Sequence, residues 1–332
     1  PLLGGYFTTH LSWRWIFYIN LPLGVVAMIL IAATLPGRAE RRSHRIDYAG
    51  AGLLAAALSA IILMTDVGGA IYAWDSPEVL TLGTVGLVAL VACLLVERRA
   101  EEPVVPLHLF RNRSFAVTSA IGLIVGFAMF GSVTYLPLFL QVVKGSSPTG
   151  SGLQLVPMMA GMLTSSIVSG QLISRTGRYK LFPIVGTATM SVSLFLLSRM
   201  TVDTRMTTIL AMTLLLGLGM GLVMQVLVIA VQNAVDYRDL GVATSGNTLF
   251  RSIGGSVGTG GVGPGFGAPL GGGLATLPNG PDEGTLGGLS LHALSELPPA
   301  VRTAYAQAFT ASTDSIFAAA AVVGLIGFAL SW

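Results

Sequence analysis

Long apolar runs alternate with short polar segments along almost the whole chain. An α-helix rises 1.5 Å per residue, so about 20 apolar residues cross the roughly 30 Å hydrocarbon core of a bilayer. Runs of this kind cover residues 15–36, 48–70, 78–96, 114–140, 151–174, 181–198, 207–231, 240–262 and 315–332. The pattern predicts an all-α polytopic membrane protein with about nine transmembrane helices.

The eighth run is the least regular, because glycine and proline crowd the segment that follows Gly254. In a helix interior, glycine costs about 1 kcal/mol and proline about 3 kcal/mol relative to alanine. We therefore expect Pro264 and Pro269 to kink or unwind the end of this helix.

The composition agrees with a surface covered by lipid. Of the 332 residues, 53% are hydrophobic and only 10% are charged, and the mean hydropathy is +0.77. A soluble domain of this length needs many more charged residues to cover its surface. The lipid bilayer is therefore the first partner that the sequence predicts.

Basic residues are distributed unevenly between the loops on the two sides of the predicted spans. Twelve of the 18 follow the first, third, fifth or seventh span: Arg38, Arg41, Arg42, Arg45, Arg98, Arg99, Arg111, Arg113, Arg175, Arg178, Lys180 and Arg238. By the positive-inside rule, this richer side faces the cytoplasm. We expect a multi-pass protein of a bacterial-type cytoplasmic membrane, without a basic, aromatic-rich face for nucleic acid.

Motifs for metal, nucleotide or catalytic chemistry are weak. Cys93 is the single cysteine, and the four histidines are scattered without the spacing of metal ligands. The glycine pattern that begins at Gly258 follows no predicted strand, which argues against a nucleotide site. No nucleophile with a base and no carboxylate pair lies within the spans, so we predict neither an enzyme nor a metal site.

Several short stretches share one resemblance. The chain begins with PLLGG at residues 1–5 and continues with SWRWIFYINLPLG at residues 12–24. Later stretches read YLPLFLQ at 135–141, GSSPTGSG at 145–152 and FRSIGGSVG at 250–258. Together they resemble helices five, six, nine, ten and thirteen of the fourteen-helix drug:proton antiporters, the EmrB/QacA type, of the major facilitator superfamily.

The resemblance implies a partial major facilitator fold that lacks the N-terminal helices. Residues 1–36 would end the N-terminal bundle, and residues 37–113 would form a two-helix insert with cytoplasmic loops. Residues 114–332 would form the C-terminal six-helix bundle, with an external loop at about 263–313 that contains a short helix over Pro299–Ala311. A proton gradient would drive transport without any bound cofactor.

Two motifs implied by the resemblance concern gating. Pro1, Gly4 and Gly5 match part of the antiporter motif of helix five, although close helix packing explains the glycines equally well. The stretch GQLISRTGRYK resembles the cytoplasmic loop motif, with Ser174 in place of its aspartate. The motif residues are Gly170, Arg175, Gly177 and Arg178, whose role is either to form the turn and fix topology or to gate transport.

Arg14 lies between Trp13 and Trp15 at the end of the first span. Aromatic and basic residues gather at the headgroup level, so Arg14 is either an interfacial anchor or part of an extracellular gate.

Polar and adaptable apolar residues within the spans are candidates for the substrate cavity. They are Gln141, Gln154, Gln225, Asn247, Tyr135, Phe130, Met158, Met224 and Arg251. Helix packing is the competing interpretation for each, and Arg251 in particular needs a partner or a water-filled path.

A proton antiporter needs a carboxylate within the membrane that alternates between its charged and neutral forms. Of the 15 acidic residues, only Asp66 falls within a predicted span, near its outer edge, where we interpret it as an interfacial cap. The coupling carboxylate is therefore expected in the N-terminal helices.

The first functional hypothesis is proton-coupled efflux of lipophilic or cationic drugs by a monomer. The second is a facilitator-superfamily exporter of one specific metabolite or antibiotic. The third is an inactive truncated membrane fragment that lacks the first bundle and cannot alternate its access.

Overall fold

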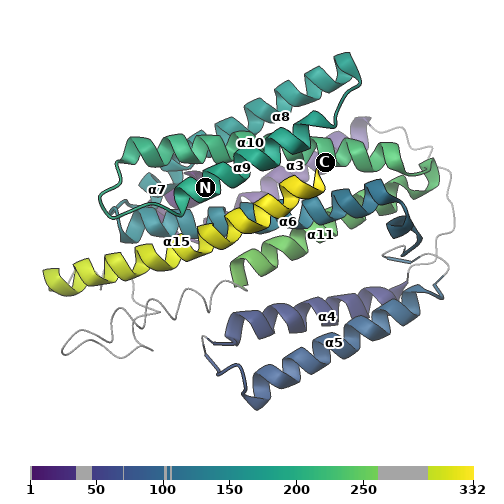
Figure 1. The fold of residues 1–332 in the computed structure, drawn as a ribbon, viewed down its shortest axis with the longest axis horizontal. Helices are drawn as coiled ribbons and strands as arrows, with labels where there is room; N and C mark the ends of the chain where they lie inside the picture. Colours follow the sequence, from purple (N-terminus) through teal and green to yellow (C-terminus); the bar gives the residue numbers. More distant parts are fainter. Residues whose placement is uncertain (1, 35–46, 70, 101–102, 105–106, 261–297) are drawn as a thin grey trace.

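The computed structural model describes residues 2–34, 47–69, 71–100, 103–104, 107–260 and 298–332 (Figure 1). Its helices are α1 (Leu2–His10), α2 (Trp15–Tyr18), α3 (Asn20–Thr34), α4 (Tyr48–Val67), α5 (Pro77–Glu97), η1 (Leu107–Arg111), α6 (Arg113–Val142), α7 (Pro148–Gln154), α8 (Val156–Thr176), α9 (Leu181–Leu197), α10 (Met206–Ala234), η2 (Tyr237–Asp239), α11 (Leu240–Gly260) and α15 (Pro299–Leu330).

The all-α polytopic fold is confirmed. Seven helical segments among the described residues are long and apolar enough to cross a membrane. Two other predicted spans also form helices, but one is shorter and the other is less apolar than these seven. The helix α9 has 17 residues, and α11 has 21 residues but is richer in polar residues and glycine. The chain is therefore a multi-pass membrane protein.

The main bundle consists of α6, α8, α9, α10, α11 and α15 (Figure 1). In this bundle α8 packs on α10, α10 on α9, α9 on α15, α15 on α6, and α6 on α11. Fully buried side chains fill its centre, among them Phe139, Leu194, Leu216, Met220 and Phe317.

Glycines bring two pairs of these helices close together. A Cβ atom added to Gly217 of α10 would overlap the carbonyl of Met158 in α8, and one added to Gly254 of α11 would overlap the carbonyl of Leu123 in α6. Because lipid is as apolar as the side chains, close van der Waals packing at small residues stabilises such helix pairs.

The helices α4 and α5 pair with each other at the edge of the bundle, and α4 also contacts α11 (Figure 1). Ser76 caps α5 by accepting a hydrogen bond from the Val79 amide at 3.4 Å, and Asp47 caps α4 by accepting one from the Gly50 amide at 2.8 Å. The helix α3 has no buried residue.

The last span differs from its prediction. The predicted run covers residues 315–332, with an external loop before it, but α15 already begins at Pro299 and continues for 32 residues. The short helix predicted over Pro299–Ala311 is the first part of α15. The predicted loop up to residue 297, including Pro264 and Pro269, lies outside the described residues.

Hydroxyl side chains explain why the apolar pattern misses the start of α15. Thr310, Ser312 and Thr313 are buried, and each donates to the carbonyl four residues earlier at 2.7, 3.0 and 2.8 Å. A hydroxyl bonded to its own helix can be buried at low cost. The segment is therefore polar by composition but suited to a membrane helix.

Candidate functional site

Two ends of the bundle are named here by their basic residues. The Lys144 end contains the α6–α7 and α9–α10 connections, and the Arg178 end contains the α8–α9 connection and the start of α6. The positive-inside rule predicts that the Arg178 end faces the cytoplasm.

At the Lys144 end, α1 packs against α7. The hydroxyl of Thr149 donates to the carbonyl of Gly5 at 3.0 Å. A Cβ atom added to Gly5 would lie 2.5 Å from the carbonyl oxygen of Pro148, so this close approach requires glycine. A Cβ added to Gly4 would meet nothing within 4 Å, and Pro1 lies outside the described residues.

A cavity of about 440 Å³ lies beside this contact, between α1 and α2 on one side and α6 and α7 on the other. Gln141 and Pro137 of α6 line it together with Ser151 of α7. The amide of Gln141 donates to the Ser151 hydroxyl at 2.9 Å. The predicted ligand Gln141 therefore faces a cavity, and its amide is held by a neighbouring helix.

Four other predicted ligands take part in packing. The Tyr135 hydroxyl donates to the carbonyl of Thr259 at 2.7 Å, and the buried Asn247 amide donates to the carbonyl of Thr118 at 3.1 Å. Both bonds join α6 to α11. Gln154 accepts from the Ser146 hydroxyl at 3.1 Å, and Met158 lies in the core.

The remaining candidates are more accessible. Gln225 of α10 and Phe130 of α6 are exposed, whereas Met224 is partly buried against the core. Arg251 of α11 is half-buried, and the described residues give its guanidinium no ion pair.

Sequence reasoning missed a polar stripe on α11. The exposed residues of this helix are Gly241, Ser245, Thr248 and Ser252, which recur at intervals of four, three and four residues along one face. None of them bears an apolar side chain, whereas the exposed residues of α5, α8, α9 and α15 are mostly apolar. The sequence signal that could have revealed the stripe is the helical spacing of Ser245, Thr248 and Ser252 close to Arg251.

Sequence reasoning also missed Asp314, because the predicted last span began one residue after it. Asp314 lies inside α15, and its Oδ1 atom is buried without a hydrogen-bond partner among the described residues. The guanidinium of Arg199, just beyond the end of α9, acts electrostatically on this carboxylate. The expectation that Asp66 alone lies within a span was therefore wrong.

Asp66 itself is exposed near the C-terminal end of α4. Its Oδ1 atom would lie 3.7 Å from a Cβ atom added to Gly260, which places it at the contact between α4 and α11.

The loop motif forms the turn after α8. Gly177 adopts a φ of 68°, a left-handed conformation that favours glycine, and its amide donates to the carbonyl of Ile173 at 2.8 Å. Arg175 and Arg178 are exposed, and Ser174 donates back to the carbonyl of Gln171 at 3.0 Å. A Cβ on Gly170 would meet nothing within 4 Å.

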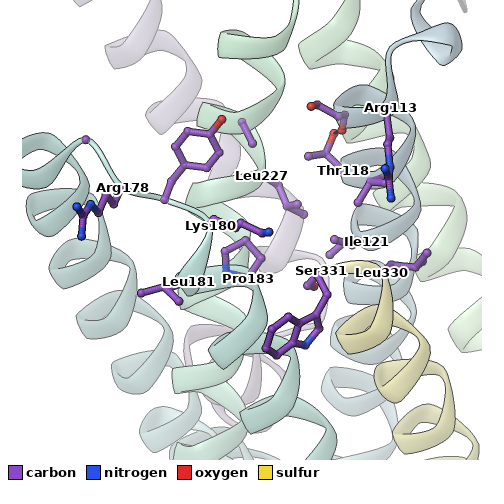
Figure 2. A pocket seen from close by; sticks show the side chains of 16 residues that line it. Arg113, Thr118, Ile121, Arg178, Lys180, Leu181, Pro183, Leu227, Leu330 and Ser331 are labelled. Atoms are coloured by element: carbon purple, nitrogen blue, oxygen red, sulfur yellow. Dashed lines mark hydrogen bonds between the residues drawn. The ribbon is translucent and has the colours of Figure 1, made fainter.

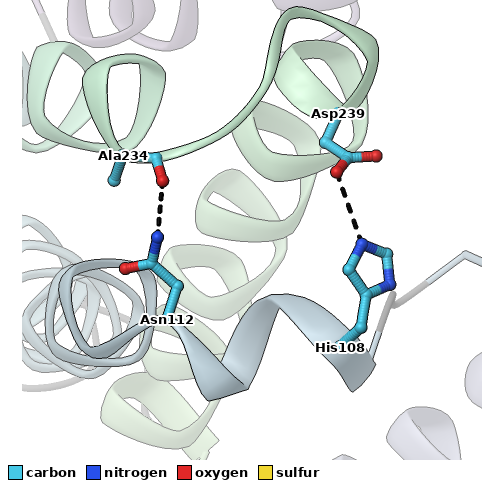
Figure 3. A network of polar contacts seen from close by, with 4 residues as sticks. All are labelled: His108, Asn112, Ala234 and Asp239. Atoms are coloured by element: carbon cyan, nitrogen blue, oxygen red, sulfur yellow. Dashed lines mark hydrogen bonds and ion pairs between the residues drawn. The ribbon is translucent and has the colours of Figure 1, made fainter.

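At the same end, polar contacts fix the start of α6 (Figure 3). Asn112 caps this helix by accepting from the Ser114 amide at 2.9 Å, and its own amide donates to the carbonyl of Ala234 at the end of α10. His108 and Asp239 approach to 3.4 Å and join η1 to η2. These contacts join the start of α6 to the end of α10, and η1 to η2, which precedes α11.

The Arg178 end also contains a cavity of about 680 Å³, shown in Figure 2. It is bounded by α6, the α8–α9 turn, α9, α10 and the end of α15. In the part of the chain that the structure describes, no three His, Cys, Asp or Glu side chains gather as metal ligands would.

A bundle of membrane-length helices with close glycine contacts defines a polytopic helical membrane protein. Residues 1–259 match the Major Facilitator Superfamily, and the chain belongs to this superfamily. It is 39% identical, over its whole length, to an uncharacterised MFS-type transporter of Mycobacterium tuberculosis, of which it covers 48%.

The names of two further relatives state a function. The multidrug transporter protein MdtP of Bacillus subtilis is 39% identical over 78% of this chain and 48% of its own length. A tetracycline resistance determinant of Streptomyces rimosus is 39% identical over 64% of this chain and 61% of its own length. The chain thus spans about half the length of the Mycobacterium tuberculosis and Bacillus subtilis relatives.

A solved structure shares the fold. A bacterial homologue of the human lysosomal transporter Spinster, in an inward-facing and occupied conformation, aligns with a TM-score of 0.51 at 19% identity. The alignment covers 85% of this chain and 64% of that chain. At this identity the likeness supports the major facilitator fold alone.

The gating roles of Gly4, Arg14, Arg175 and the other motif residues remain predictions. Arg14 is exposed, and its guanidinium lies 5.4 Å from the centre of the Trp13 ring. A cation over an aromatic face is attracted by the ring quadrupole, and this pair suits a headgroup-level position.

Proposed function

We propose that this chain belongs to a proton-coupled exporter of lipophilic or cationic drugs, in the fourteen-helix group of its superfamily. The exposed polar stripe on α11, defined by Gly241, Ser245, Thr248 and Ser252, is the observation that carries the proposal. Thr248 and Ser252 donate to carbonyls of their own helix at 3.1 and 3.0 Å, but this face carries no exposed apolar side chain for contact with lipid tails. Such a face favours a water-filled path or another helix beside it. In a transporter this stripe lines the substrate path between two bundles.

The fourteen-helix assignment has two supports. One is the α4–α5 pair, which packs at the edge of the six-helix bundle as an inserted pair would. The other is the share of the relatives that the chain covers, 48% in two cases, which leaves room for a first bundle. On this proposal residues 1–36 end that bundle, residues 37–113 are the insert and residues 114–332 form the second bundle of a monomer in the cytoplasmic membrane.

Accessible residues of the bundle are assigned to the substrate path. They are Gln225, Phe130 and Arg251, together with the partly buried Met224 and with Gln141 at the cavity beside α1. Tyr135, Met158 and Asn247 are assigned to packing, because each is bonded to or buried against another helix, and Gln154 because it is bonded to Ser146 in the α6–α7 connection. The names of the multidrug and tetracycline relatives support drugs as the substrate class.

Gating is assigned to the contact between α1 and α7. The glycine-dependent approach at Gly5 closes the Lys144 end, and its separation would open that end to the outside. Arg14 anchors the adjoining segment at the membrane surface. The loop motif at the Arg178 end supplies the turn through Gly177, with Arg175 and Arg178 exposed beside it.

Asp314 is assigned to proton coupling. Its Oδ1 atom is buried inside α15 without a hydrogen-bond partner among the described residues, and Arg199 acts electrostatically on the carboxylate. An acidic side chain within a membrane helix is a candidate for a group that gains and loses a proton during transport.

The experiment is drug efflux from cells that lack their own pumps. The complete reading frame that contains this chain is expressed, and ethidium efflux is followed by fluorescence with and without a protonophore, with MdtP as the positive control. We expect protonophore-sensitive efflux, and we expect Asp314→Asn to abolish the dependence on the pH gradient while the protein still inserts. Efflux unaffected by the protonophore would contradict proton coupling, and no efflux beside an active control would contradict drug export.

A specific exporter is the second candidate, and Arg251 is the observation that favours it. A half-buried guanidinium without an ion pair among the described residues suits a cargo that bears an acidic group. If Arg251→Gln leaves cation efflux unchanged but abolishes export of one acidic compound, the chain is a specific exporter rather than a drug pump.

A further inference from the structure

The cavity at the Arg178 end has a charge that the drug-export function does not explain. Arg113 at the start of α6 and Arg178 and Lys180 after α8 line it. Figure 2 shows Arg178 and Arg113 on opposite sides of the cavity, with Lys180 between them. No aspartate or glutamate is among the described residues that line this cavity.

The three cations are also uncompensated. Within the described residues the structure gives no ion pair to the side chains of Arg113, Arg178 or Lys180. Three like charges around one space repel one another, and an anion between them would relieve the repulsion. A cationic drug would be repelled, so the cavity does not suit the proposed substrate.

The walls of the cavity are apolar below this basic rim. Val117 and Ile121 of α6, Leu227 of α10 and Leu330 of α15 line it. A small hydrated anion such as free phosphate would leave these side chains facing water. An amphiphile, with an anionic head and a hydrocarbon tail, would match both the rim and the walls.

Hydroxyl groups and an indole complete the rim. Ser114 and Tyr179 line the cavity together with Trp332, beyond the end of α15. Hydroxyl and indole N–H groups are donors to phosphate oxygens, and tryptophan is enriched at the headgroup level of membranes. The position at the end of the bundle therefore agrees with a lipid headgroup.

We propose that this cavity binds the phosphate headgroup of an anionic phospholipid, held by Arg113, Arg178 and Lys180, with the acyl chains against the apolar wall. Basic pockets between membrane helices on the cytoplasmic side are suited to anionic headgroups. The lipid would join the α8–α9 turn to the start of α6 and the end of α15. This inference rests on the membrane location of the chain and does not require that it transports a drug.

Trp332 provides a direct measurement, because its indole lines the cavity. The probe is the protein of the complete reading frame, in which Trp13, Trp15, Trp74 and any tryptophan outside these 332 residues are replaced with phenylalanine, so that Trp332 is the sole tryptophan. It is placed in phosphatidylcholine vesicles that contain one part in ten of phosphatidylglycerol. Either the phosphatidylglycerol or an equal amount of the phosphatidylcholine is brominated near the top of its acyl chains, and bromine quenches an indole that it contacts.

We expect brominated phosphatidylglycerol to quench Trp332 far more strongly than the same fraction of brominated phosphatidylcholine. Each basic residue near the surface contributes about 1 kcal/mol, or about a fivefold gain in local lipid concentration. The triple variant Arg113→Gln, Arg178→Gln, Lys180→Gln should lose the difference between the two lipids.

A matched triple variant controls for general surface charge. Arg98→Gln, Arg99→Gln and Arg111→Gln remove the same charge from exposed residues that do not line the cavity. This control should keep the preference. Equal quenching by the two lipids, or equal loss in the two triple variants, would overturn the proposal. Loss of the preference in millimolar inorganic phosphate would also overturn it, because the site would then recognise free phosphate.

Discussion

The helices α5 and α11 have the same length of 21 residues, yet their exposed faces differ in chemistry. On α5 the exposed side chains in the middle of the helix are mostly apolar: Val85, Leu87, Val88 and Val91, with Thr84 beside them. On α11 they are Ser245, Thr248 and Ser252. The difference suggests two kinds of exposed surface: on the proposed function, α5 would face lipid, whereas α11 would face the polar substrate path.

The buried faces of the two helices differ as well. The helix α5 packs against α4, with Gly86 facing Ile61. The helix α11 packs closely against α6 through Gly254 and Gly258, and a Cβ on Gly126 of α6 would overlap the carbonyl of Arg251. A helix whose exposed face is polar needs such a contact, because lipid would not stabilise that face in the membrane.

A lysine substitution on each exposed face should give the largest difference between α5 and α11 in membrane insertion. Val88→Lys places an ammonium on the lipid-facing side of α5 near the middle of the helix, where a lysine costs about 2.5–3.5 kcal/mol of insertion free energy. Thr248→Lys places the same charge on the polar stripe near the middle of α11. We expect the α5 variant to lose most of its membrane-inserted yield and the α11 variant to insert.

The measurement is the fraction of protein that resists extraction by alkaline carbonate, compared with total expression. A wild-type fraction for Val88→Lys would show that α5 does not face lipid. Equal loss in both variants would remove the distinction between the two helices.

Overpacking should give the next largest effect. Gly254→Ala places a methyl group against the carbonyl of Leu123, and the forced separation of α11 from α6 should destabilise the protein by about 1–3 kcal/mol. Gly241→Ala adds the same methyl group on the exposed stripe of α11, where a Cβ meets nothing within 4 Å.

Thermal unfolding in detergent, followed by size-exclusion chromatography, measures both variants. We expect a clear fall in the midpoint for Gly254→Ala and a change near zero, or a small rise, for Gly241→Ala, since alanine is the better helix former. A fall of the same size in both variants would mean that α11 does not depend on its close contact with α6.

Most of the fold could be predicted from the sequence, because the spacing of apolar runs directly reports helices of membrane length. The start of the last helix could not, since Thr310, Ser312 and Thr313 satisfy their hydroxyls within the helix and hydropathy alone scores them as polar. This error hid Asp314, the carboxylate that the proposed function assigns to proton coupling.

The candidate site was less predictable. Residue type selected Tyr135 and Asn247 as ligands, but their bonds to Thr259 and Thr118 across α6 and α11 depend on helix packing that one sequence does not display. The same packing decides which face of α11 is exposed. The turn at Gly177 was more predictable, because it depends on local backbone geometry.

The smallest structural change tests whether the stripe has a function. Thr248 of α11 and Thr84 of α5 are both exposed, and each hydroxyl donates to the carbonyl four residues earlier, at 3.1 and 2.7 Å. Replacing either with valine removes one hydroxyl at nearly constant volume and should change stability by about 0.5 kcal/mol or less.

Transport should nevertheless distinguish these two variants. If α11 lines the substrate path, Thr248→Val removes a hydrogen-bonding group from that path, and we expect ethidium efflux to fall about five- to tenfold, which corresponds to about 1.0–1.4 kcal/mol. Thr84→Val should keep the wild-type rate, because α5 presents the same hydroxyl to lipid. A normal rate in both variants, measured at equal expression, would reduce the stripe on α11 to a surface for packing against another helix.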